Sequence, residues 1–263
     1  MGTIDKAFSL LVFFKESRAS ISLAEMTRLA GYDKATTRRL LQSLVHNGML
    51  ERDPVSGGYR IGPLPQKLAA LREKTVPLDT LVRNTLTRLT AETQETTHFS
   101  VVTEAAMILT AVNEPDRATR VVFDAGEEIP FHTTASGLSY LAFSPEPVVD
   151  RILSETLKSV TRYSIVDPAV LRAMLPKIRK ASIAEVDQLN EIDVHGIAAP
   201  VFDQAGAVYG ALAVALPVHR VTARVRKDIA ALVRREARNL SIEIGGSPPE
   251  TEPDGNRKPE PAA

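Results

Sequence analysis

The stretch SLAEMTRLAGYDKATTRRLLQSLVHNG, residues 22–48, constrains the fold most, because it marks both ends of two short helices. Ser22 begins a capping-box pattern, in which a Ser and a Glu three residues later satisfy the first N–H groups of a helix. Gly31 can end that helix, and Asp33 can cap the next one. The Asn-Gly pair that closes the stretch can supply a left-handed helix end. The pattern therefore predicts two helices joined by a tight turn.

The second of these helices, expected over residues 34–46, has an apolar face and a basic face. A rotation of about 100° per residue separates the two. The residues expected to point inward are Thr37, Leu40, Leu41 and Leu44. The opposite face can meet base edges and phosphates, because the major groove of DNA admits one helix. The candidate DNA contacts on this helix are Lys34, Thr36, Arg38, Arg39 and Gln42.

A first helix and a β-hairpin complete the N-terminal region. The apolar run near residues 4–14 predicts an amphipathic helix. Its buried face is expected to carry Ile4, Phe8, Leu11 and Val12. The strands MLERD and YRIG, joined by PVSGG, predict a hairpin on which Arg52 and Arg60 can reach phosphates or the minor groove. Residues 1–62 are thus interpreted as a winged helix-turn-helix DNA-binding domain, against the alternative of a three-helix bundle without a ligand.

The charge of the chain is divided unevenly. The formal net charge is zero, but residues 1–75 carry twelve Lys and Arg and seven Asp and Glu, a net of +5, so the remainder carries −5. A basic N-terminal part indicates a polyanionic partner for that part alone. The absence of Cys excludes disulfides and thiolate metal sites. Because no segment reaches the ~20 apolar residues of a membrane span, we expect a cytoplasmic protein that does not bind membranes.

The rest of the chain predicts a linker helix over residues 63–77, a second domain over 78–245 and a Pro-rich, charged, disordered tail over 246–263. Within these regions, helices are expected near 66–74, 78–93, 135–143, 145–156, 168–180 and 222–243. Strands are expected near 97–103, 106–112, 119–124, 196–202 and 207–215. Strand pairs joined by short turns are typical of an α+β domain around an antiparallel sheet.

Three segments of the chain resemble the IclR family of bacterial transcription regulators, the isocitrate lyase regulator type. The first runs from IDKAFSLLVFF through the helices to GGYRIGP, and the others are IPFHTTASGLSYLAF and GIAAPVFDQAGAVYGALAV. The resemblance spans about residues 4–244. It implies operator DNA as a partner, a GAF or profilin-like sheet domain that binds an effector, and dimerisation through the N-terminal region. We expect a homodimer that assembles further into a homotetramer, because one recognition helix reads too few base pairs for useful specificity.

The segment HTTASGLSYLAF, residues 132–143, predicts a site for an anion. A helix that begins near Ala135 presents unpaired N–H groups at Ser136 and Gly137, and its dipole favours negative charge there. Thr134 could instead do no more than cap this helix. In the family this helix start borders the effector pocket, and the effectors are mostly small organic acids, aromatic acids among them. The candidate effector-binding residues are His98, His132, Thr134, Ala135, Ser136, Gly137, Asp187, His195, Gly196, Ala213 and Ala215.

Two departures from the family pattern bear on the effector. Many relatives carry a Lys at the position of Leu138, and some that bind small polar acids carry serines at Ala213 and Ala215. A pocket with fewer polar partners for its ligand favours an aromatic or hydrophobic acid.

Asp187 and Glu191 belong to EVDQLNEIDVHG, a segment that folds over the pocket in the family.

Two other functions stay open from the residues. A hydrolase could use Ser136, His132 and Asp187, but the nucleophile elbow G-x-S-x-G and an S-x-x-K pair are absent, so we expect no enzyme activity. A sensor module whose winged helix binds protein would need an acidic or apolar face on the third helix, where this chain has a basic one. The histidines follow no metal-binding spacing, and we expect neither a metal nor a cofactor.

Overall fold

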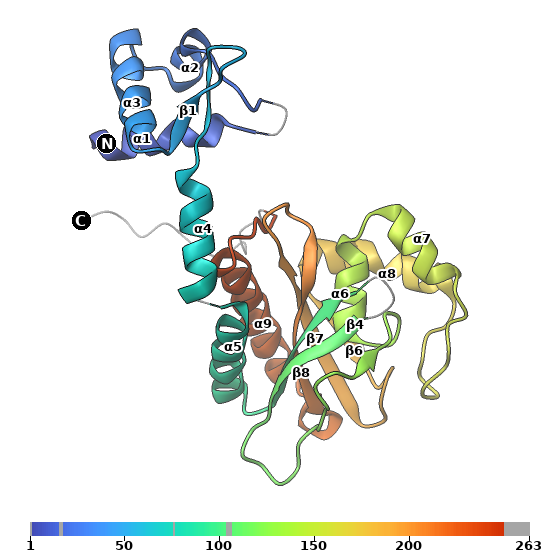
Figure 1. Cartoon of the computed structure of the whole chain (residues 1–263). Coiled ribbons are helices and arrows are strands. Elements are labelled where there is room, and N and C mark those ends of the chain that lie inside the picture. Colours follow the sequence, from blue (N-terminus) through green and yellow to red (C-terminus); the bar gives the residue numbers. More distant parts are fainter. Residues whose placement is uncertain (1, 16–17, 76, 104–106, 250–263) are drawn as a thin grey trace, which may run out of the picture. The chain divides into compact units, whose positions relative to one another are not determined.

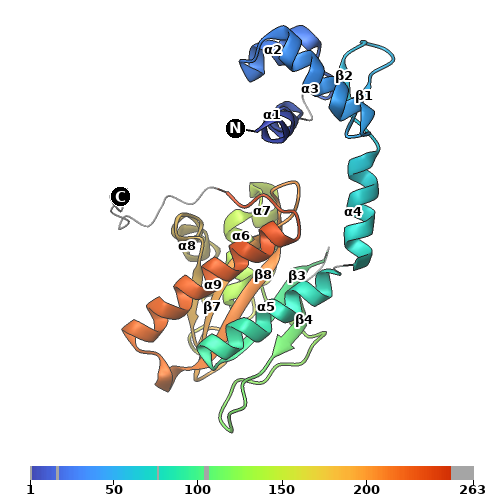
Figure 2. The same cartoon turned by 90° about the vertical axis from the view of Figure 1, so that its left-hand side faces the viewer.

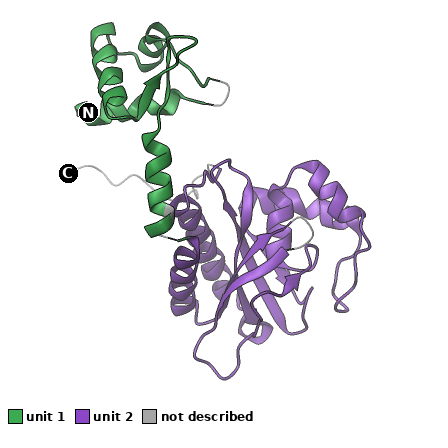
Figure 3. Cartoon of the chain, in the orientation of Figure 1, with its two compact units in different colours: residues 1–77 green, residues 78–263 purple. Residues whose placement is uncertain are grey.

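The computed structural model describes residues 2–15, 18–75, 77–103 and 107–249 of the chain (Figure 1; Figure 2 gives the same structure turned by 90°). The chain divides into two compact units, residues 1–77 and residues 78–263 (Figure 3). Each unit has its own hydrophobic core, and each is described by itself below.

Unit 1 has the order helix, helix, turn, helix, hairpin, helix. Its elements are α1 (Thr3–Ser9), the 3-10 helix η1 (Leu11–Phe13), α2 (Leu23–Ala30), α3 (Lys34–His46), β1 (Leu50–Arg52), β2 (Tyr59–Ile61) and α4 (Leu64–Thr75). The capping residues take the predicted roles: the Ser22 hydroxyl accepts the Glu25 N–H at 3.2 Å, and Gly31 ends α2 with φ +68°. Short-range signals therefore decide where these helices begin and end.

The core of unit 1 forms between α2, α3 and the wing. Its buried apolar residues are Leu10, Ile21, Met26, Leu40, Leu41, Leu44, Leu50 and Tyr59. Thr37 is buried with them, so the inward face predicted for α3 is confirmed. The backbones of Ile21 and Tyr59 exchange two hydrogen bonds of 2.8 and 2.9 Å, which tie the wing to the segment before α2.

The predicted buried face of the first helix is wrong. Ile4, Phe8 and Val12 are 74%, 52% and 68% exposed, whereas Leu10 is fully buried. The α-helix ends at Ser9 and continues as a 3-10 turn, so the rotation of 100° per residue does not extend through the apolar run. Three large apolar side chains consequently remain on the surface of this unit.

Unit 2 is built on one six-stranded antiparallel sheet with the order β5-β4-β3-β8-β7-β6. The strands are β3 (Thr96–Val102), β4 (Met107–Asn113), β5 (Glu128–Ile129), β6 (Ala184–Asp187), β7 (Val194–Phe202) and β8 (Val208–Pro217). The helices are α5 (Leu78–Thr93), α6 (Ala135–Phe143), α7 (Glu146–Ser154), α8 (Pro168–Ala181), the 3-10 helix η2 (Val218–Arg220) and α9 (Ala223–Glu243). α5 and α9 lie side by side on one face of the sheet (Figure 2), and α6 and α8 cover the other.

The two faces follow from the alternation of side chains along each strand. On β8, Leu212 and Val214 belong to the core under α5 and α9. Ala213, between them, belongs to the core under α6 and α8. The same alternation places Ile197 on the α9 side of β7 and Ala198 on the α6 side. A shift of one residue along a strand would therefore move a side chain from one face of the sheet to the other.

Two expectations about unit 2 need correction. Residues 119–124 form no strand: within this segment the Val121 carbonyl accepts a hydrogen bond from the Thr96 hydroxyl at 2.6 Å, so a side chain rather than a strand ladder holds it. The edge strand β6 was not predicted. In residues 246–249, the expected beginning of the tail, the Ser247 N–H donates to the Asp203 carbonyl at 3.0 Å. Residues 250–263, the remainder of the expected tail, lie outside the described residues.

Across the described ranges, the helices are all too short or too polar to span a bilayer.

Candidate nucleic-acid interface and ligand cavity

α3 presents a cationic face that its own neighbours leave open. The Asp33 carboxylate accepts the Thr36 N–H at 2.8 Å, and the pKa of Asp33 is lowered by hydrogen bonds from the side chain and backbone of Thr36. Arg38, Arg39 and Gln42 are exposed, and the helix contains no acidic residue. In the part of the chain that the structure describes, neither Arg38 nor Arg39 forms an ion pair. Both guanidinium groups are thus free to meet an anionic surface.

The arginines of the wing are engaged inside the wing. Arg52 donates to the Gly57 carbonyl at 2.7 Å, and its guanidinium lies 4.0 Å from the centre of the Tyr59 ring. Arg60 lies 2.6 Å from a carboxylate oxygen of Glu51. These contacts rigidify the hairpin, and any phosphate contact by Arg60 has to compete with Glu51.

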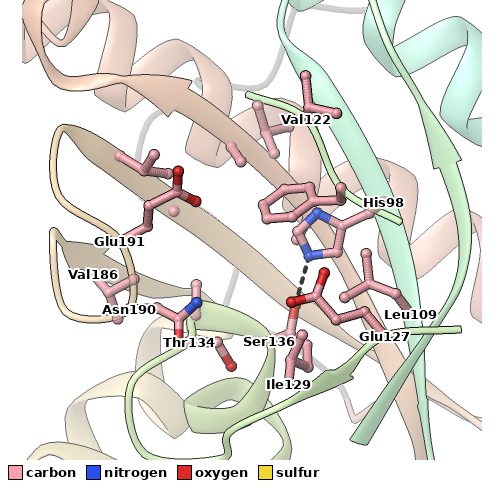
Figure 4. Close-up of a pocket in the computed structure, with 17 residues that line it drawn as sticks. His98, Leu109, Val122, Glu127, Ile129, Thr134, Ser136, Val186, Asn190 and Glu191 are labelled. Carbon is pink, nitrogen blue, oxygen red and sulfur yellow. Dashed lines mark hydrogen bonds between the residues drawn. The ribbon is translucent and has the colours of Figure 1, made fainter. Parts of the chain in front are cut away.

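In unit 2, small residues on the central strands leave space between the sheet and α6. Gly196 of β7 pairs with Ala215 of β8, and Ala213 of β8 pairs with His98 of β3. Because these small residues do not fill the space beneath α6, a cavity of about 130 Å³ remains. It is lined by His98, Leu109, Val122, Phe123, Glu127, Ile129, Thr134, Ala135, Ser136, Val186, Asn190, Glu191, Val194, Gly196, Ala213, Val214 and Ala215 (Figure 4). An engineered cavity of roughly 150 Å³ holds benzene, so this one suits a ligand built around about one ring.

The N-terminus of α6 borders the cavity. The Thr134 hydroxyl donates to the Pro130 carbonyl at 2.6 Å and accepts the Gly137 N–H at 3.0 Å. The cap therefore uses the Gly137 N–H that was expected to hold an anion. The N–H groups of Ala135 and Ser136 belong to the first helical turn, which has no intrahelical acceptors for them, and both residues line the cavity.

His98 is a neutral polar group in the cavity wall. Its Nε2 lies 3.2 Å from the Ser136 hydroxyl, and its ring packs edge-on against Phe123. Burial lowers the pKa of His98 to about 4. No described atom pairs with its Nδ1. Near neutral pH the imidazole is therefore uncharged, and one of its nitrogen atoms has unused hydrogen-bonding capacity.

Two exposed carboxylates line the cavity. Glu127, which precedes β5, and Glu191, in the loop between β6 and β7, both line the cavity and are both exposed. Burial, together with the negative charge of Glu127, raises the pKa of Glu191. The lining contains no Lys or Arg to offset these charges. The same loop is tied to the start of α6, because the Asn190 side chain accepts from the Thr133 hydroxyl at 2.9 Å.

Seven of the eleven candidate effector residues line the cavity, and four lie elsewhere. A Cβ on Gly137 would lie 2.4 Å from the backbone of Phe131, so this glycine lets α6 approach that segment and does not face the cavity. His132 is bonded to the Lys158 carbonyl at 2.9 Å. Asp187 and His195 are paired with each other at 3.4 Å and extend from the α9 face of the sheet. None of these four residues lines the cavity.

Other features of the cavity were not predicted. Leu138, at the family's Lys position, is fully buried in the core and does not line the cavity. The apolar wall formed by Leu109, Phe123 and Ile129 was missed, because these residues lie on β4, in a loop and on a two-residue strand with no shared sequence signal. Glu191 could be found from the resemblance of its segment, whereas Glu127 carried no such signal.

The two sites together define a class of protein: a transcription regulator with a winged helix-turn-helix and a separate ligand-binding sheet domain. Comparisons with known proteins agree. The family described as bacterial transcriptional regulator IclR C-terminal matches residues 73–242, and the IclR helix-turn-helix domain matches residues 3–54. The chain belongs to the IclR family of transcriptional regulators, which confirms the resemblance seen in the sequence.

Individual relatives support the same assignment. The DNA-binding transcriptional repressor YiaJ of Escherichia coli (strain K12) is 30% identical over 230 residues, which cover 85% of this chain and 80% of that protein. The structure of an IclR transcriptional regulator from Silicibacter sp. TM1040 matches with a TM-score of 0.82 and 38% identity, over 95% of this chain and 98% of that one. An IclR homolog from Microbacterium hydrocarbonoxydans, solved with 4-hydroxybenzoate, shares the fold with a TM-score of 0.58 and 22% identity, over 92% of this chain and 99% of that one.

The low pKa of His98 predicts a pH-dependent loss of stability. Between pH 6.5, the ordinary pKa of histidine, and pH 4, the unfolded chain binds a proton at this site that the folded chain does not. The free energy of unfolding therefore falls as the pH falls through that window, by about 3 kcal/mol in total. In His98→Leu this component is absent, so wild type should lose about 2–3 kcal/mol more than the variant between pH 7.5 and pH 4.5.

Denaturant unfolding of the full chain, followed by circular dichroism at both pH values, measures this difference. His219→Gln removes an exposed histidine of the same unit and should leave the pH dependence of wild type unchanged. Parallel pH profiles of wild type and His98→Leu would contradict a buried, neutral His98.

Proposed function

We propose that this chain binds operator DNA through α3 and adjusts that binding to a small organic acid held in the cavity of unit 2. The observation that carries the DNA proposal is the exposed, acid-free face of α3 with Arg38 and Arg39 unpaired among the described side chains. Arginine can make bidentate contacts to guanine or to a phosphate, and a capped helix holds it in place. The proposed contacts are Lys34, Thr36, Arg38, Arg39 and Gln42, with Arg52 and Arg60 of the wing near the backbone.

The effector proposal rests on the lining of the cavity. The N–H groups of Ala135 and Ser136 favour an anion at the start of α6, and Phe123, Ala213 and Ala215 favour an apolar body. The homolog that holds 4-hydroxybenzoate is consistent with an aromatic acid of this size. Such a ligand changes operator affinity only if it binds the DNA-competent and incompetent arrangements differently, a coupling of typically about 1–3 kcal/mol.

Catalysis is not proposed, although Ser136 and His98 are hydrogen-bonded in the cavity. A general base works best when its pKa lies near the operating pH, and the pKa of His98 is lowered to about 4. Among the described residues, no carboxylate pairs with the second nitrogen of His98 to orient the ring. The alternative trio of Ser136, His132 and Asp187 is dispersed, since Asp187 extends from the α9 face of the sheet.

Substitution of the α3 arginines should weaken DNA binding without unfolding the protein. Arg38→Ala and Arg39→Ala each remove an exposed side chain, and loss of a base contact costs about 1–3 kcal/mol of binding free energy. Fluorescence anisotropy with a duplex that wild type selects from a random pool measures the change. Arg224→Ala removes the same charge from unit 2, where the side chain is 91% exposed, and should bind like wild type. Wild-type affinity in both α3 variants would place the interface elsewhere.

Filling the cavity should abolish effector binding while DNA binding persists. Ala215→Val adds two methyl groups to the floor of a cavity of about 130 Å³ and suits the strand conformation. We expect calorimetric titration of benzoate and its para-substituted derivatives to show at least a tenfold loss of affinity relative to wild type. Ala91→Val, an equal change on the exposed surface of α5, is the control. Unchanged acid affinity in Ala215→Val would show that the acid binds outside this cavity.

We also propose that unit 1 dimerises through its exposed apolar residues. Ile4 and Phe8 on α1 are 74% and 52% exposed, and Leu68 and Leu71 on α4 are 49% and 58% exposed. Large apolar side chains at these levels of exposure are typical of an interaction surface. A homodimer would also supply the paired half-sites that specific DNA binding requires.

Light scattering tests the dimer. Phe8→Glu combined with Leu71→Glu should shift wild type from at least a dimer to a monomer at micromolar concentration, because two charges would have to be buried at each copy of the surface. Val55→Glu makes the same change at the 94% exposed tip of the wing and should leave the mass unchanged. A monomeric wild type would refute this proposal.

A further inference from the structure

The charge of the cavity is the opposite of what a simple acid requires. Glu127 and Glu191, both exposed, line it, the lining contains no Lys or Arg, and among the described residues neither carboxylate forms an ion pair. A ligand whose only charge is a carboxylate would approach two negative charges without a compensating cation. An acid that carried a positive group at its other end would instead meet complementary charge at both ends.

We propose that the ligand of this cavity is amphoteric: a small carboxylic acid that also bears an ammonium group, recognised by Glu127 and Glu191. The carboxylate lies at the start of α6, and the ammonium group lies against the two glutamates. This inference rests on the proposed function, in which the cavity holds an acid.

The inner end of the cavity suits the carboxylate. The N–H groups of Ala135 and Ser136 lack intrahelical acceptors and therefore favour an anion at the helix start, where the helix dipole adds to the attraction. His98 is buried and uncharged, so it neither attracts nor repels the carboxylate as an ion, and it can supply a hydrogen bond through its unpaired nitrogen. The anion is therefore held by dipoles and not by a basic side chain.

Glu127 and Glu191 suit the ammonium group. In Figure 4 Glu191 lies on one side of the cavity, and Glu127 lies on the other with His98 and Ser136. Burial raises the pKa of Glu191, and the nearby negative charge of Glu127 raises it further. A cation bound between them would relieve that repulsion and satisfy both groups. The loop that carries Glu191 is also anchored to the start of α6 through Asn190 and Thr133, which fixes the distance between the two ends.

The middle of the cavity restricts the body of the ligand. Val122, Phe123 and Val186 give apolar walls, and Ala215 lies on the floor. The volume of about 130 Å³ accommodates one ring or a short aliphatic chain. A carboxylate and an ammonium group joined by such a body match the cavity from the helix start to its opening.

Matched probes test this proposal in the full-length protein. The first trio consists of 4-(aminomethyl)benzoate, 4-methylbenzoate and 4-methylbenzylamine, and the second of 5-aminopentanoate, pentanoate and pentylamine. Within each trio the members differ only in which charged end is present. We expect calorimetry at pH 7.5 to show that the amphoteric member of at least one trio binds at least tenfold more tightly than either partner.

Charge-neutral variants identify the groups responsible. In Glu127→Gln and Glu191→Gln the advantage of the amphoteric probe over the plain acid should fall to threefold or less. The plain acid should bind these variants more tightly than it binds wild type. Glu128→Gln is the matched control, because Glu128 is adjacent in sequence and exposed but does not line the cavity. Thermal unfolding of each variant verifies that it is folded.

The outcomes separate the two proposals. If the plain acids bind wild type as tightly as the amphoteric probes, the ammonium site is refuted and acid sensing stands. If the plain amines bind as tightly as the amphoteric probes, the carboxylate adds nothing, and acid sensing is refuted together with the amphoteric ligand. If no probe binds at millimolar concentration, both proposals are overturned. If Glu128→Gln behaves like the other two variants, the effect is one of overall charge and the assignment of Glu127 and Glu191 is wrong.

Discussion

The close approach of α6 to the backbone at Phe131 is the contact on which the ligand-binding unit depends. Gly137 permits it, since any Cβ at this position would lie 2.4 Å from main-chain atoms that cannot move aside like a flexible side chain. The contact places the first turn of α6 over the strands where Gly196, Ala213 and Ala215 leave space. The cavity is therefore a consequence of small residues in two layers: one lets the helix approach, and the others keep the sheet from filling the space beneath it.

The two units differ in the charge of their candidate binding sites. In unit 1 the exposed face of α3 is cationic, whereas Arg60 of the wing is paired with Glu51 and Asp53. In unit 2 the lining of the cavity combines a helix N-terminus and a neutral His98 with two exposed carboxylates. A net charge of zero for the whole chain conceals both arrangements. The local field at each site, and not the overall charge, determines which partner can bind there.

The sheet separates two kinds of polar group in unit 2. His98 and Ser136 face the cavity, whereas His195, Glu185 and Asp187 lie on the α9 side, where Arg226 approaches Glu185 at 3.4 Å. In the second group Arg226 and Glu185 form an ion pair, and the Asp187 carboxylate lies 3.4 Å from His195 Nδ1. Histidines that look equivalent in the sequence are thus assigned to different roles by the parity of their position on a strand.

The sequence alone predicted the features that depend on interactions between residues close together in the chain. The caps at Ser22 and Asp33, the inward face of α3 and its basic outer face follow from the 3.6-residue period and from backbone groups that must be satisfied within a few residues. The winged helix-turn-helix, the antiparallel sheet and the start of α6 near Ala135 were predicted for the same reason. What only the tertiary structure decided depends on contacts between distant segments. Packing and strand register decide three features that no local pattern encodes. Leu10 is buried in place of Phe8, His195 lies on the α9 face of the sheet, and Glu127 and Glu191 line the same cavity.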